Sequence, residues 1–388
     1  MLHIECLQTE IEAWSAFAQH KQEQFTEKVE VAHGYLQSPP PPVEIRARLA
    51  PLLGRDWTGA LPATEAPLDA SFSAPARPPD DVTLIAVDGS QIFPDRHAAI
   101  LYYLIQVGAI VFRYNGQTPI PHSRPALYYQ DSDLFDAQGY VVSAEKVNLR
   151  RLTQEMAYLC ELATDERRAA PTTPLFALTD GPLLWAYPER GQDIERAFQA
   201  YLEALGALQQ TGVIPVGYVD RPGGRAFLEL LWALHLAPEE LVERIGENPF
   251  QQLRDYRLME RRLPPGARTA WFTRPTTINR RHSEAGQEIW FCYLNVGEAG
   301  HPVIARVEAP AWAIPNESAM LTLHTALLHQ ARVLNGYPYV LARAHEEALV
   351  TTLDKKALED VLQRQLMEKG LVPQMSEKAR QKAYLGKR

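Results

Sequence analysis

Two aspartates end two apolar stretches of this sequence in the same way. Residues 83–88 read TLIAVD and are followed by Gly-Ser, and residues 174–180 read PLFALTD and are followed by Gly. A short apolar run that ends at a turn signal predicts a buried strand. If the two strands are parallel neighbours, Asp88 and Asp180 meet at the carboxyl edge of the sheet, where open α/β sheets bind ligands. Two like charges this close are tolerated when a divalent cation binds them, and oxygen ligands favour Mg2+ or Mn2+.

A helix between these strands offers a third acid. Residues 145–168 predict a helix whose buried face carries apolar residues at spacings of four, three and four: Leu152, Met156, Leu159 and Ala163. At about 100° per residue, Glu155 lies about 70° from the centre of that face, whereas Glu161 falls on the solvent side. Glu155 is therefore the better candidate for a metal ligand. Helix geometry equally allows a solvated residue that pairs with Arg151 one turn earlier.

A tyrosine and a histidine lie near the C-terminus in the stretch GYPYVLARAH, residues 336–345. Proline suits the first turn of a helix, so we expect a helix from Pro338 onward. His345 lies beside its inward face, which comprises Leu341, Ala344, Ala348, Leu349 and Thr352. A histidine directed into a carboxylate cluster can coordinate a metal or take a proton, and we expect Tyr337 to face the same cleft. The alternative for His345 is an ordinary core histidine.

The elements around these motifs predict a mixed α/β protein. In order, we expect a strand at 83–88, a run at 98–112 read as two strands with a turn or bulge at Gly108, a helix at 145–168, a strand at 174–179, a helix at 193–210, a strand at 213–219 ending on Asp220, a strand at 303–307 and helices at 317–333 and 339–370. Hairpin-type strands followed by parallel strands with helices are typical of a ribonuclease H-like fold, a mixed sheet flanked by helices.

We expect three regions along the chain. Residues 1–81 form an N-terminal helix and proline-rich arm, residues 82–370 form the main domain with an insertion at about 221–290, and residues 371–388 form a basic tail. The first helix carries apolar residues at helical spacing: Ile4, Leu7, Ile11, Trp14 and Phe17. This stripe needs a partner, which is either another subunit in an assembly or the core of the same chain.

Composition excludes several classes of protein. The chain has 388 residues and a net charge of -8, which argues against a surface that binds nucleic acid all over but allows a local basic groove. Its three cysteines form neither a metal pair nor a disulfide framework, which fits a reducing cytoplasm. The apolar run at 98–112 is shorter than the roughly 20 residues that span a bilayer. We therefore expect a cytoplasmic protein with no membrane segment and no signal peptide.

Taken together, these motifs resemble the NurA nucleases. The shared pattern is an apolar strand ending in VDGS (87–90), a helical glutamate, a second strand ending in DG (180–181), and GYP followed by AH near the C-terminus. The resemblance covers about residues 82–362 in order and spacing. The site residues that it implies are Asp88, Glu155, Asp180, Tyr337 and His345, all of them metal ligands except the tyrosine.

The resemblance implies a ribonuclease H-like fold and a manganese-dependent DNA nuclease with single-strand endonuclease and 5′-to-3′ exonuclease activities. Two metal ions are expected, Mn2+ with Mg2+ as the alternative, because two ions both activate water and stabilise the charge on phosphate. Asp88 is expected to bridge them, His345 to hold the second ion or help the leaving group, and Tyr337 to position the phosphate. The implied partners are single- and double-stranded DNA ends, a second copy of the chain and the hexameric ATPase HerA, in DNA end processing and repair.

We expect DNA contacts from a basic and aromatic stretch, since phosphates pair with arginine and unpaired bases stack on aromatic rings. The stretch comprises Arg261, Arg262, Arg268, Trp271, Phe272, Arg274, Arg280, Arg281 and His282. The alternative is a solvated hairpin with one core aromatic residue. For the whole protein, the alternatives are a non-catalytic DNA-end-binding or assembly subunit, and a nuclease of the same fold that cleaves RNA.

Overall fold

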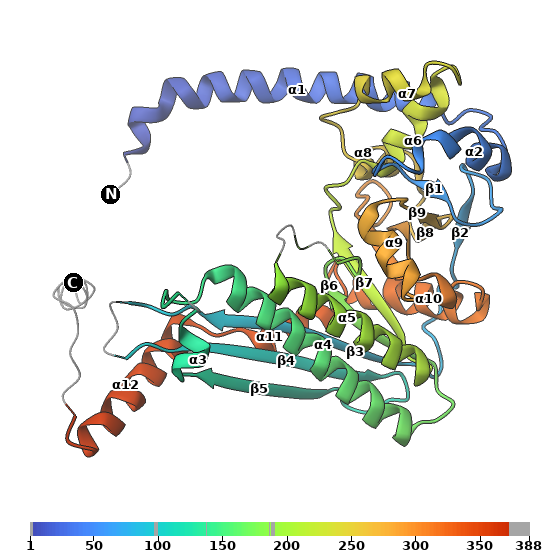
Figure 1. Ribbon diagram of the computed structural model, residues 1–388. Helices are drawn as coiled ribbons and strands as arrows, with labels where there is room; N and C mark the ends of the chain where they lie inside the picture. Colours follow the sequence, from blue (N-terminus) through green and yellow to red (C-terminus); the bar gives the residue numbers. More distant parts are fainter. Residues whose placement is uncertain (1–2, 97–99, 137, 186, 188–190, 372–388) are drawn as a thin grey trace. The chain divides into compact units, whose positions relative to one another are not determined.

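The computed structural model describes residues 3–371 apart from 97–99, 137, 186 and 188–190 (Figure 1). The chain divides into two units, each assembled from distant segments of the sequence. The first unit comprises Met1–Pro78, Gly181–Leu184 and Gly217–Tyr337, and the second comprises Pro79–Asp180, Trp185–Val216 and Pro338–Arg388. This division differs from the linear order of arm, domain and tail expected from the sequence. Apart from Leu371, the expected tail lies outside the described residues.

The second unit is a mixed sheet flanked by helices. Its elements are β3 (Thr83–Ile92), β4 (Tyr103–Arg113), β5 (Ile120–Tyr128), α3 (Asp131–Leu134), α4 (Ala144–Ala169), β6 (Leu175–Asp180), α5 (Gln192–Gln210), the first residues of β7 (Ile214–Asp220), α11 (Tyr339–Ala348) and α12 (Thr352–Glu368). The strand order is β7-β6-β3-β4-β5, with β3, β4 and β5 antiparallel and β6 parallel to β3. An antiparallel meander followed by a helix and a parallel strand confirms the predicted ribonuclease H-like arrangement.

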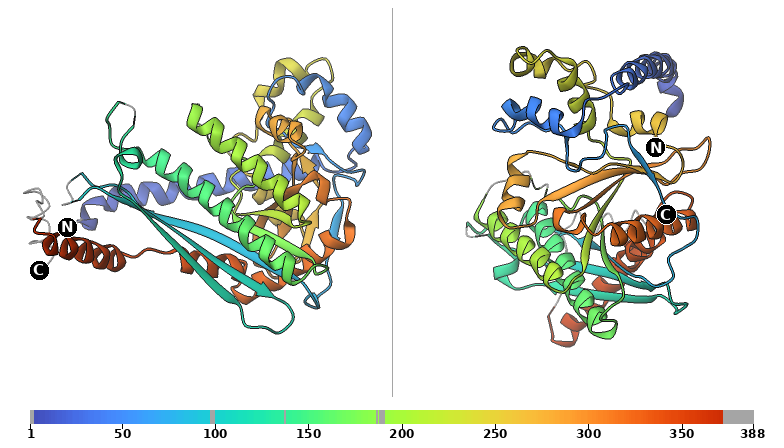
Figure 2. Two further views of the ribbon diagram at one scale, coloured as in Figure 1. Left: turned by 60° about the horizontal axis from the view of Figure 1, so that its bottom comes forward. Right: turned by 90° about the vertical axis from the view of Figure 1, so that its right-hand side faces the viewer.

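Helices cover both faces of this sheet. α4 and α5 lie side by side on one face, and α11 packs on the other (Figure 2). α4 begins after Ser143, whose hydroxyl caps the helix by accepting a hydrogen bond from the backbone of Lys146. Its buried residues include Met156 and Leu159, which belong to the apolar face read from the sequence. α4 and α5 each begin and end within one residue of the bounds predicted from the sequence.

Two strands of the second unit run further than predicted. β3 does not end at Asp88 but continues to Ile92, because β4 pairs with it up to the Ile92–Leu104 pair. β4 is a single strand through Gly108, where we expected a turn or bulge. A Cβ at Gly108 would lie 2.1 Å from the backbone nitrogen of Ala348 at the end of α11. The glycine therefore permits close helix packing and makes no turn.

The C-terminal helical segment is broken into two helices. α11 ends at Ala348, and α12 begins after Thr351, which forms a capping box with Asp354. Leu349 lies between the two helices and is exposed, so it does not belong to the inward face on which we placed it. The capping residues were present in the sequence, but the apolar spacing continued past them and hid the break.

The first unit has an antiparallel sheet and most of the helices. Its elements are α1 (Gln8–Gly34), α2 (Pro42–Leu49), β1 (Leu61–Pro62), β2 (Ser71–Ser73), the last residues of β7, α6 (Ala226–His235), α7 (Leu241–Arg244), α8 (Asp255–Arg262), β8 (Ala267–Thr269), β9 (Phe272–Thr273), α9 (Thr277–Glu284), β10 (Ile289–Asn295), β11 (Ile304–Pro310) and α10 (Glu317–Val333). The strand order is β1-β9-β10-β11-β7, and β8 pairs with both β10 and β2. The stretch predicted as an insertion therefore supplies much of this unit.

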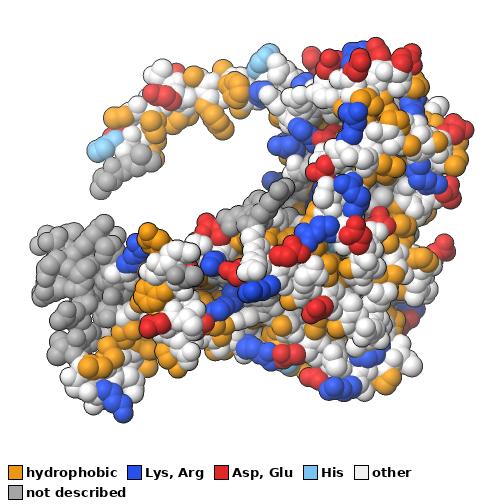
Figure 3. Space-filling model, in the orientation of Figure 1, with side chains coloured by type: hydrophobic (Ala, Val, Ile, Leu, Met, Phe, Trp, Pro, Cys, Tyr) orange, Lys and Arg blue, Asp and Glu red, His pale blue; other side chains and the backbone are white. Residues whose placement is uncertain are grey.

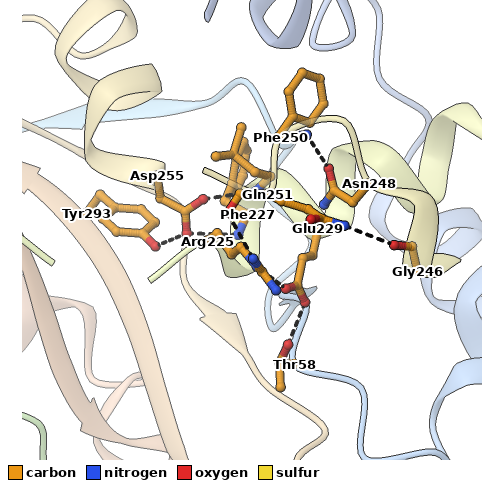
Figure 4. A network of polar contacts seen from close by, with 11 residues as sticks. Thr58, Arg225, Phe227, Glu229, Gly246, Asn248, Phe250, Gln251, Asp255 and Tyr293 are labelled. Carbon is orange, nitrogen blue, oxygen red and sulfur yellow. Dashed lines mark hydrogen bonds and ion pairs between the residues drawn. The ribbon is translucent and has the colours of Figure 1, made fainter. Parts of the chain in front are cut away.

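A buried carboxylate ties the first unit together (Figure 4). Asp255 begins α8 and is fully buried, and it accepts hydrogen bonds from the backbone nitrogens of Phe227 and Leu228 at 3.0 and 2.9 Å and from the hydroxyl of Tyr293. Its charge thus caps the N-terminus of α6, which favours an anion. The same network holds Glu229 between Thr58 and Arg225. These bonds join α6, α8 and β10, so the charged residues here stabilise the fold.

The apolar stripe is exposed along a short 3-10 helix (Ile4–Leu7) and along the N-terminal half of α1, which follows it. The predicted residues are 39 to 67 % exposed, namely Ile4, Leu7, Ile11, Trp14 and Phe17, and Figure 3 shows apolar side chains along this helix. The C-terminal half packs beside α8, where Glu30 pairs with Arg261 at 3.0 Å. The core of the same unit therefore does not cover the stripe. Among the described residues, no helix is long and apolar enough to cross a membrane.

Candidate functional site

Asp88 and His345 are in direct contact in the second unit. Nδ1 of His345, in the last turn of α11, lies 2.7 Å from Oδ2 of Asp88 on β3. The hydroxyl of Ser90 donates to the carbonyl of Ala348 and holds the end of α11 on the sheet. The side chain of Asp88 is 18 % exposed and that of His345 is 62 % exposed. The pair is thus fixed by packing and open to solvent on the histidine side.

Asp180 is the next acid along the edge of the sheet. The parallel pairing of β3 and β6 ends at the Val87–Thr179 pair, so Asp88 and Asp180 are the next residues on adjacent strands. Side chains one step past a registered pair point to the same face of a sheet. Asp180 is exposed at the end of β6. The strand register therefore brings together the two carboxylates that the sequence pattern predicted at this edge.

Glu155 is a buried acid on the helix face of the same sheet. Its side chain is only 13 % exposed. Burial raises the pKa of Glu155 from 4.5 to about 7, the neighbouring guanidinium of Arg151 opposes this, and the charges of Asp88 and Asp180 raise the pKa further. Glu155 is therefore within electrostatic range of both aspartates. Its position is neither the solvated flank nor the isolated ligand that helix geometry alone allowed.

The glycine of the VDGS motif makes room for Glu155. A Cβ at Gly89 would lie 2.3 Å from Oε1 of Glu155 and 2.9 Å from Cγ of Arg151. A side chain there would displace the carboxylate of Glu155 or the aliphatic part of Arg151 from their positions. The motif thus pairs an aspartate directed towards α11 with a position that must be empty on the α4 side.

The carboxylates approach the strand from two sides. Side chains alternate along a strand, so Asp88 and Ser90 point towards α11 while the empty side of Gly89 faces Glu155. Because β6 ends at Asp180, the edge of β3 beyond Asp88 has no strand beside it, and groups from both faces meet around this edge. In the described part of the chain, no three acidic, histidine or cysteine side chains are already grouped tightly enough to hold a metal ion.

The donor set nevertheless fits a divalent cation. Three carboxylates and one imidazole are the ligands that Mn2+ and Mg2+ sites use. Burial is the main reason that the pKa of Glu155 is raised, and the charges of Asp88 and Asp180 add to it against the opposing effect of Arg151. A cation at the open edge relieves the repulsion among these carboxylates if the side chain of Glu155 turns towards Asp88.

A known protein family matches most of this chain. Residues 82–350 match the family model of the NurA domain. The chain belongs to the NurA family. A search of curated protein sequences finds no significant match.

Solved structures of the NurA family are similar in fold. The NurA nuclease from Sulfolobus solfataricus matches with a TM-score of 0.51 and 9 % identity, covering 83 % of this chain and 93 % of that one. A structure of NurA with manganese matches with a TM-score of 0.36 and 12 % identity, covering 76 % and 91 % of the two chains. At these identities the Sulfolobus structure supports the fold, and the residue roles rest on the geometry of this chain.

Glu161 and Tyr337 are two further residues that the sequence brought into consideration for the site. Glu161 is exposed and forms a double ion pair with Arg124, which lowers the pKa of Glu161. This position agrees with the solvent side that helix geometry predicted for it. Tyr337, the tyrosine of the NurA pattern, belongs to the first unit, where its ring packs edge to face against Tyr218 at 5.8 Å. Its catalytic role stays a prediction.

The expected DNA-binding stretch is largely packed into the first unit. Trp271 is 5 % exposed and Phe272 is fully buried, so neither ring is available for stacking with a base. Arg268 lies over the rings of Trp271 and Phe72 at 5.7 and 4.6 Å. Burial lowers the pKa of Arg274, which is only partly exposed. Trp271 is therefore a core aromatic residue, as the alternative interpretation of this stretch proposed, and not a residue that stacks with bases.

Arg261, Arg280 and Arg281 of the predicted DNA-binding stretch remain at the surface, and Arg261 is paired with Glu30. Arg280 is exposed and donates to the backbone oxygens of Leu53 and Pro275. Arg281 is partly exposed on the same helix, α9. Arg280 and Arg281 stay candidates for phosphate contacts.

Arg151 is the site residue that sequence reasoning missed. The sequence suggested it only as a surface partner of Glu155, because Glu and Arg four residues apart pair on most exposed helices. The signal that could have indicated more was Gly89, because a glycine on a strand leaves space that a large side chain from a neighbouring element can fill. In the structure Arg151 contacts both Glu155 and the backbone of Gly89.

Proposed function

We propose that this protein is a metal-dependent DNA nuclease that hydrolyses phosphodiester bonds. The proposal rests on the contact of His345 with Asp88, with Asp180 next to Asp88 in the strand register and Glu155 within electrostatic range of both aspartates. Membership of the NurA family and a fold similar to the Sulfolobus NurA nuclease support the reaction class. The proposed cofactor is Mn2+, with Mg2+ as the alternative, and two ions.

The residues have distinct proposed roles. Asp88, Asp180, Glu155 and His345 hold the ions, which when bound supply an activated water and neutralise charge on the phosphate. The contact between Nδ1 of His345 and Asp88 orients the ring, so that its Nε2 faces away from the carboxylate. An imidazole held in this way can accept or donate a proton at Nε2. Tyr337 is proposed to position the scissile phosphate.

The finer properties are also proposals. Single-strand endonuclease and 5′-to-3′ exonuclease activity on DNA ends, a role in DNA end processing and repair with a HerA-type hexameric ATPase, a homodimer and a cytoplasmic location all rest on the family resemblance. One feature supports assembly with a partner: five large apolar side chains at helical spacing are exposed between Ile4 and Phe17, and contiguous exposed apolar residues often mark interaction sites.

The second candidate is a non-catalytic DNA-end-binding or assembly subunit. The observation that favours it is that Glu155 is held by Arg151 and that no metal-holding cluster is already formed among the described residues. Calorimetric titration with MnCl2 separates the two candidates. A subunit without a metal site releases no heat specific to Mn2+.

The nuclease proposal is tested with labelled single- and double-stranded DNA and RNA oligonucleotides, with and without Mn2+. We expect Mn2+-dependent cleavage of DNA by the wild type and none by Asp88→Ala or Asp180→Ala, each still folded by circular dichroism. Asp165→Ala is the matched control, because Asp165 is an exposed acid on α4 paired only with Arg168. Cleavage at the wild-type rate by either site variant refutes the proposal. Preferential cleavage of RNA shows that the substrate is RNA and not DNA.

A further inference from the structure

Arg151 places a positive charge beside the crowded carboxylates. Its Nη1 donates to Oε1 of Glu155 at 2.6 Å and to the carbonyl oxygen of Gly89 at 2.9 Å. That carbonyl lies past the last β3–β6 pair, where β6 no longer runs alongside. The guanidinium therefore sits at the open edge of β3, the same edge at which Asp88 and Asp180 meet.

This ion pair differs from an ordinary surface pair. The Arg151 and Glu155 side chains are 27 % and 13 % exposed, whereas Glu161 on the same helix and its partner Arg124 on β5 are 54 % and 49 % exposed. The buried Nε of Arg151 has no hydrogen-bond partner among the described residues. Leaving a buried donor unpaired costs free energy, so packing against Gly89 and the charge of Glu155 must hold the guanidinium in place.

We propose that Arg151 is a displaceable counter-ion: in the metal-free protein it neutralises Glu155, and an incoming divalent cation competes with it for that carboxylate. The inference rests on the proposed metal site. Glu155 is directed to Gly89 and Arg151 on the α4 side of β3, so it reaches a cation shared with Asp88 only by leaving Arg151. A cation that binds Oε1 of Glu155 competes directly with the guanidinium, because Nη1 lies 2.6 Å from that oxygen and the two positive charges repel.

Two consequences follow for the metal-free and metal-bound protein. Without metal, Arg151 keeps the carboxylates from repelling one another and so stabilises the fold. With metal, the same residue lowers the apparent affinity, because its bonds to Glu155 and Gly89 must first be broken. Arg151 is thus a positioning residue, which acts on the ion only through Glu155.

The test is calorimetric titration of the full chain with MnCl2, without DNA, for wild type, Arg151→Met and Arg151→Lys. Hydrogen bonds to charged groups contribute enough that Arg151→Met should bind Mn2+ about tenfold more tightly. Arg151→Lys keeps the charge but loses the bond to Gly89, so its Kd should fall between the other two. Arg124→Met, which removes the exposed partner that β5 supplies to Glu161 of α4, is the matched control and should bind as the wild type does.

A purely structural role for Arg151 has a different outcome. In that case Arg151→Met melts at a lower temperature than the wild type without Mn2+, and its Kd for Mn2+ is unchanged. An unchanged or weaker affinity for Mn2+ overturns the inference. If Arg151→Met does not fold, Arg151→Lys carries the test, and wild-type affinity in that variant overturns the inference as well. If the wild type itself binds no Mn2+, the proposed metal site fails and the inference fails with it. Mn2+ binding by the wild type with no gain in the variants refutes the inference alone.

Discussion

Replacing Glu155 with glutamine should stabilise the metal-free protein at neutral to alkaline pH. The pKa of Glu155 is raised from 4.5 to about 7, chiefly by burial. The folded protein therefore holds a proton on this group that the unfolded chain releases near pH 4.5. Stability contributed by the proton is fully present below pH 4.5 and is lost as pH rises to about 7. Glutamine resembles the protonated acid at every pH and avoids this loss.

The magnitude follows from the shift. About 1.4 kcal/mol per pKa unit, over the interval from 4.5 to about 7, gives about 3 kcal/mol of unfolding free energy lost by the wild type at about pH 8. Glu155→Gln should recover most of it there and differ little from the wild type at about pH 4. Urea denaturation at both pH values, followed by circular dichroism without metal, measures the difference.

The control for this experiment is on the same helix. Glu161→Gln changes an exposed acid whose pKa is lowered by hydrogen bonds from Arg124, so it should give no gain at the higher pH. Addition of Mn2+ at that pH should stabilise the wild type more than Glu155→Gln, since the variant lacks one carboxylate ligand. A wild type as stable as Glu155→Gln at both pH values refutes the reasoning, because the acid is then not buried among like charges.

Three further substitutions test the packing around the site and the core. Gly89→Ala should weaken Mn2+ binding and destabilise the fold by about 1–3 kcal/mol, since its Cβ would lie 2.3 Å from Glu155 Oε1; calorimetry and thermal melting measure both. Gly108→Ala should lower the melting temperature by pushing the end of α11 off the sheet at Ala348, and wild-type stability refutes that packing. Trp271→Ala should cost about 3–5 kcal/mol of unfolding free energy as a core residue; full stability with weakened DNA binding instead restores its stacking role.

Local patterns determined most of the elements that carry the site. The apolar run before Asp180 and the helical spacing around Met156 predicted β6 and α4 within one or two residues, whereas the run before Asp88 predicted the start of β3 but not its continuation to Ile92. These signals are local, because burial of one face imposes its period on a single segment. The order of those segments was enough to predict the ribonuclease H-like arrangement.

The errors arose where a distant segment decides the conformation. Gly108 looked like a turn, yet it lies inside β4 because α11, more than two hundred residues later, packs against it. Trp271 looked like a base-stacking residue beside several arginines, but the first unit buries it. Neither outcome leaves a mark in the neighbouring sequence, since a buried and an exposed tryptophan look the same there.

The sequence by itself therefore determined which acids this protein has and that Asp88 and Asp180 lie on neighbouring strands. Only the tertiary structure decided that Glu155 lies across β3 from Asp88, with Arg151 as its counter-ion over Gly89. The physical reason is that the pKa of a charged group, and the energy of its interactions, depend on its burial and on the charges around it. Both are set by segments that meet only when the chain has folded.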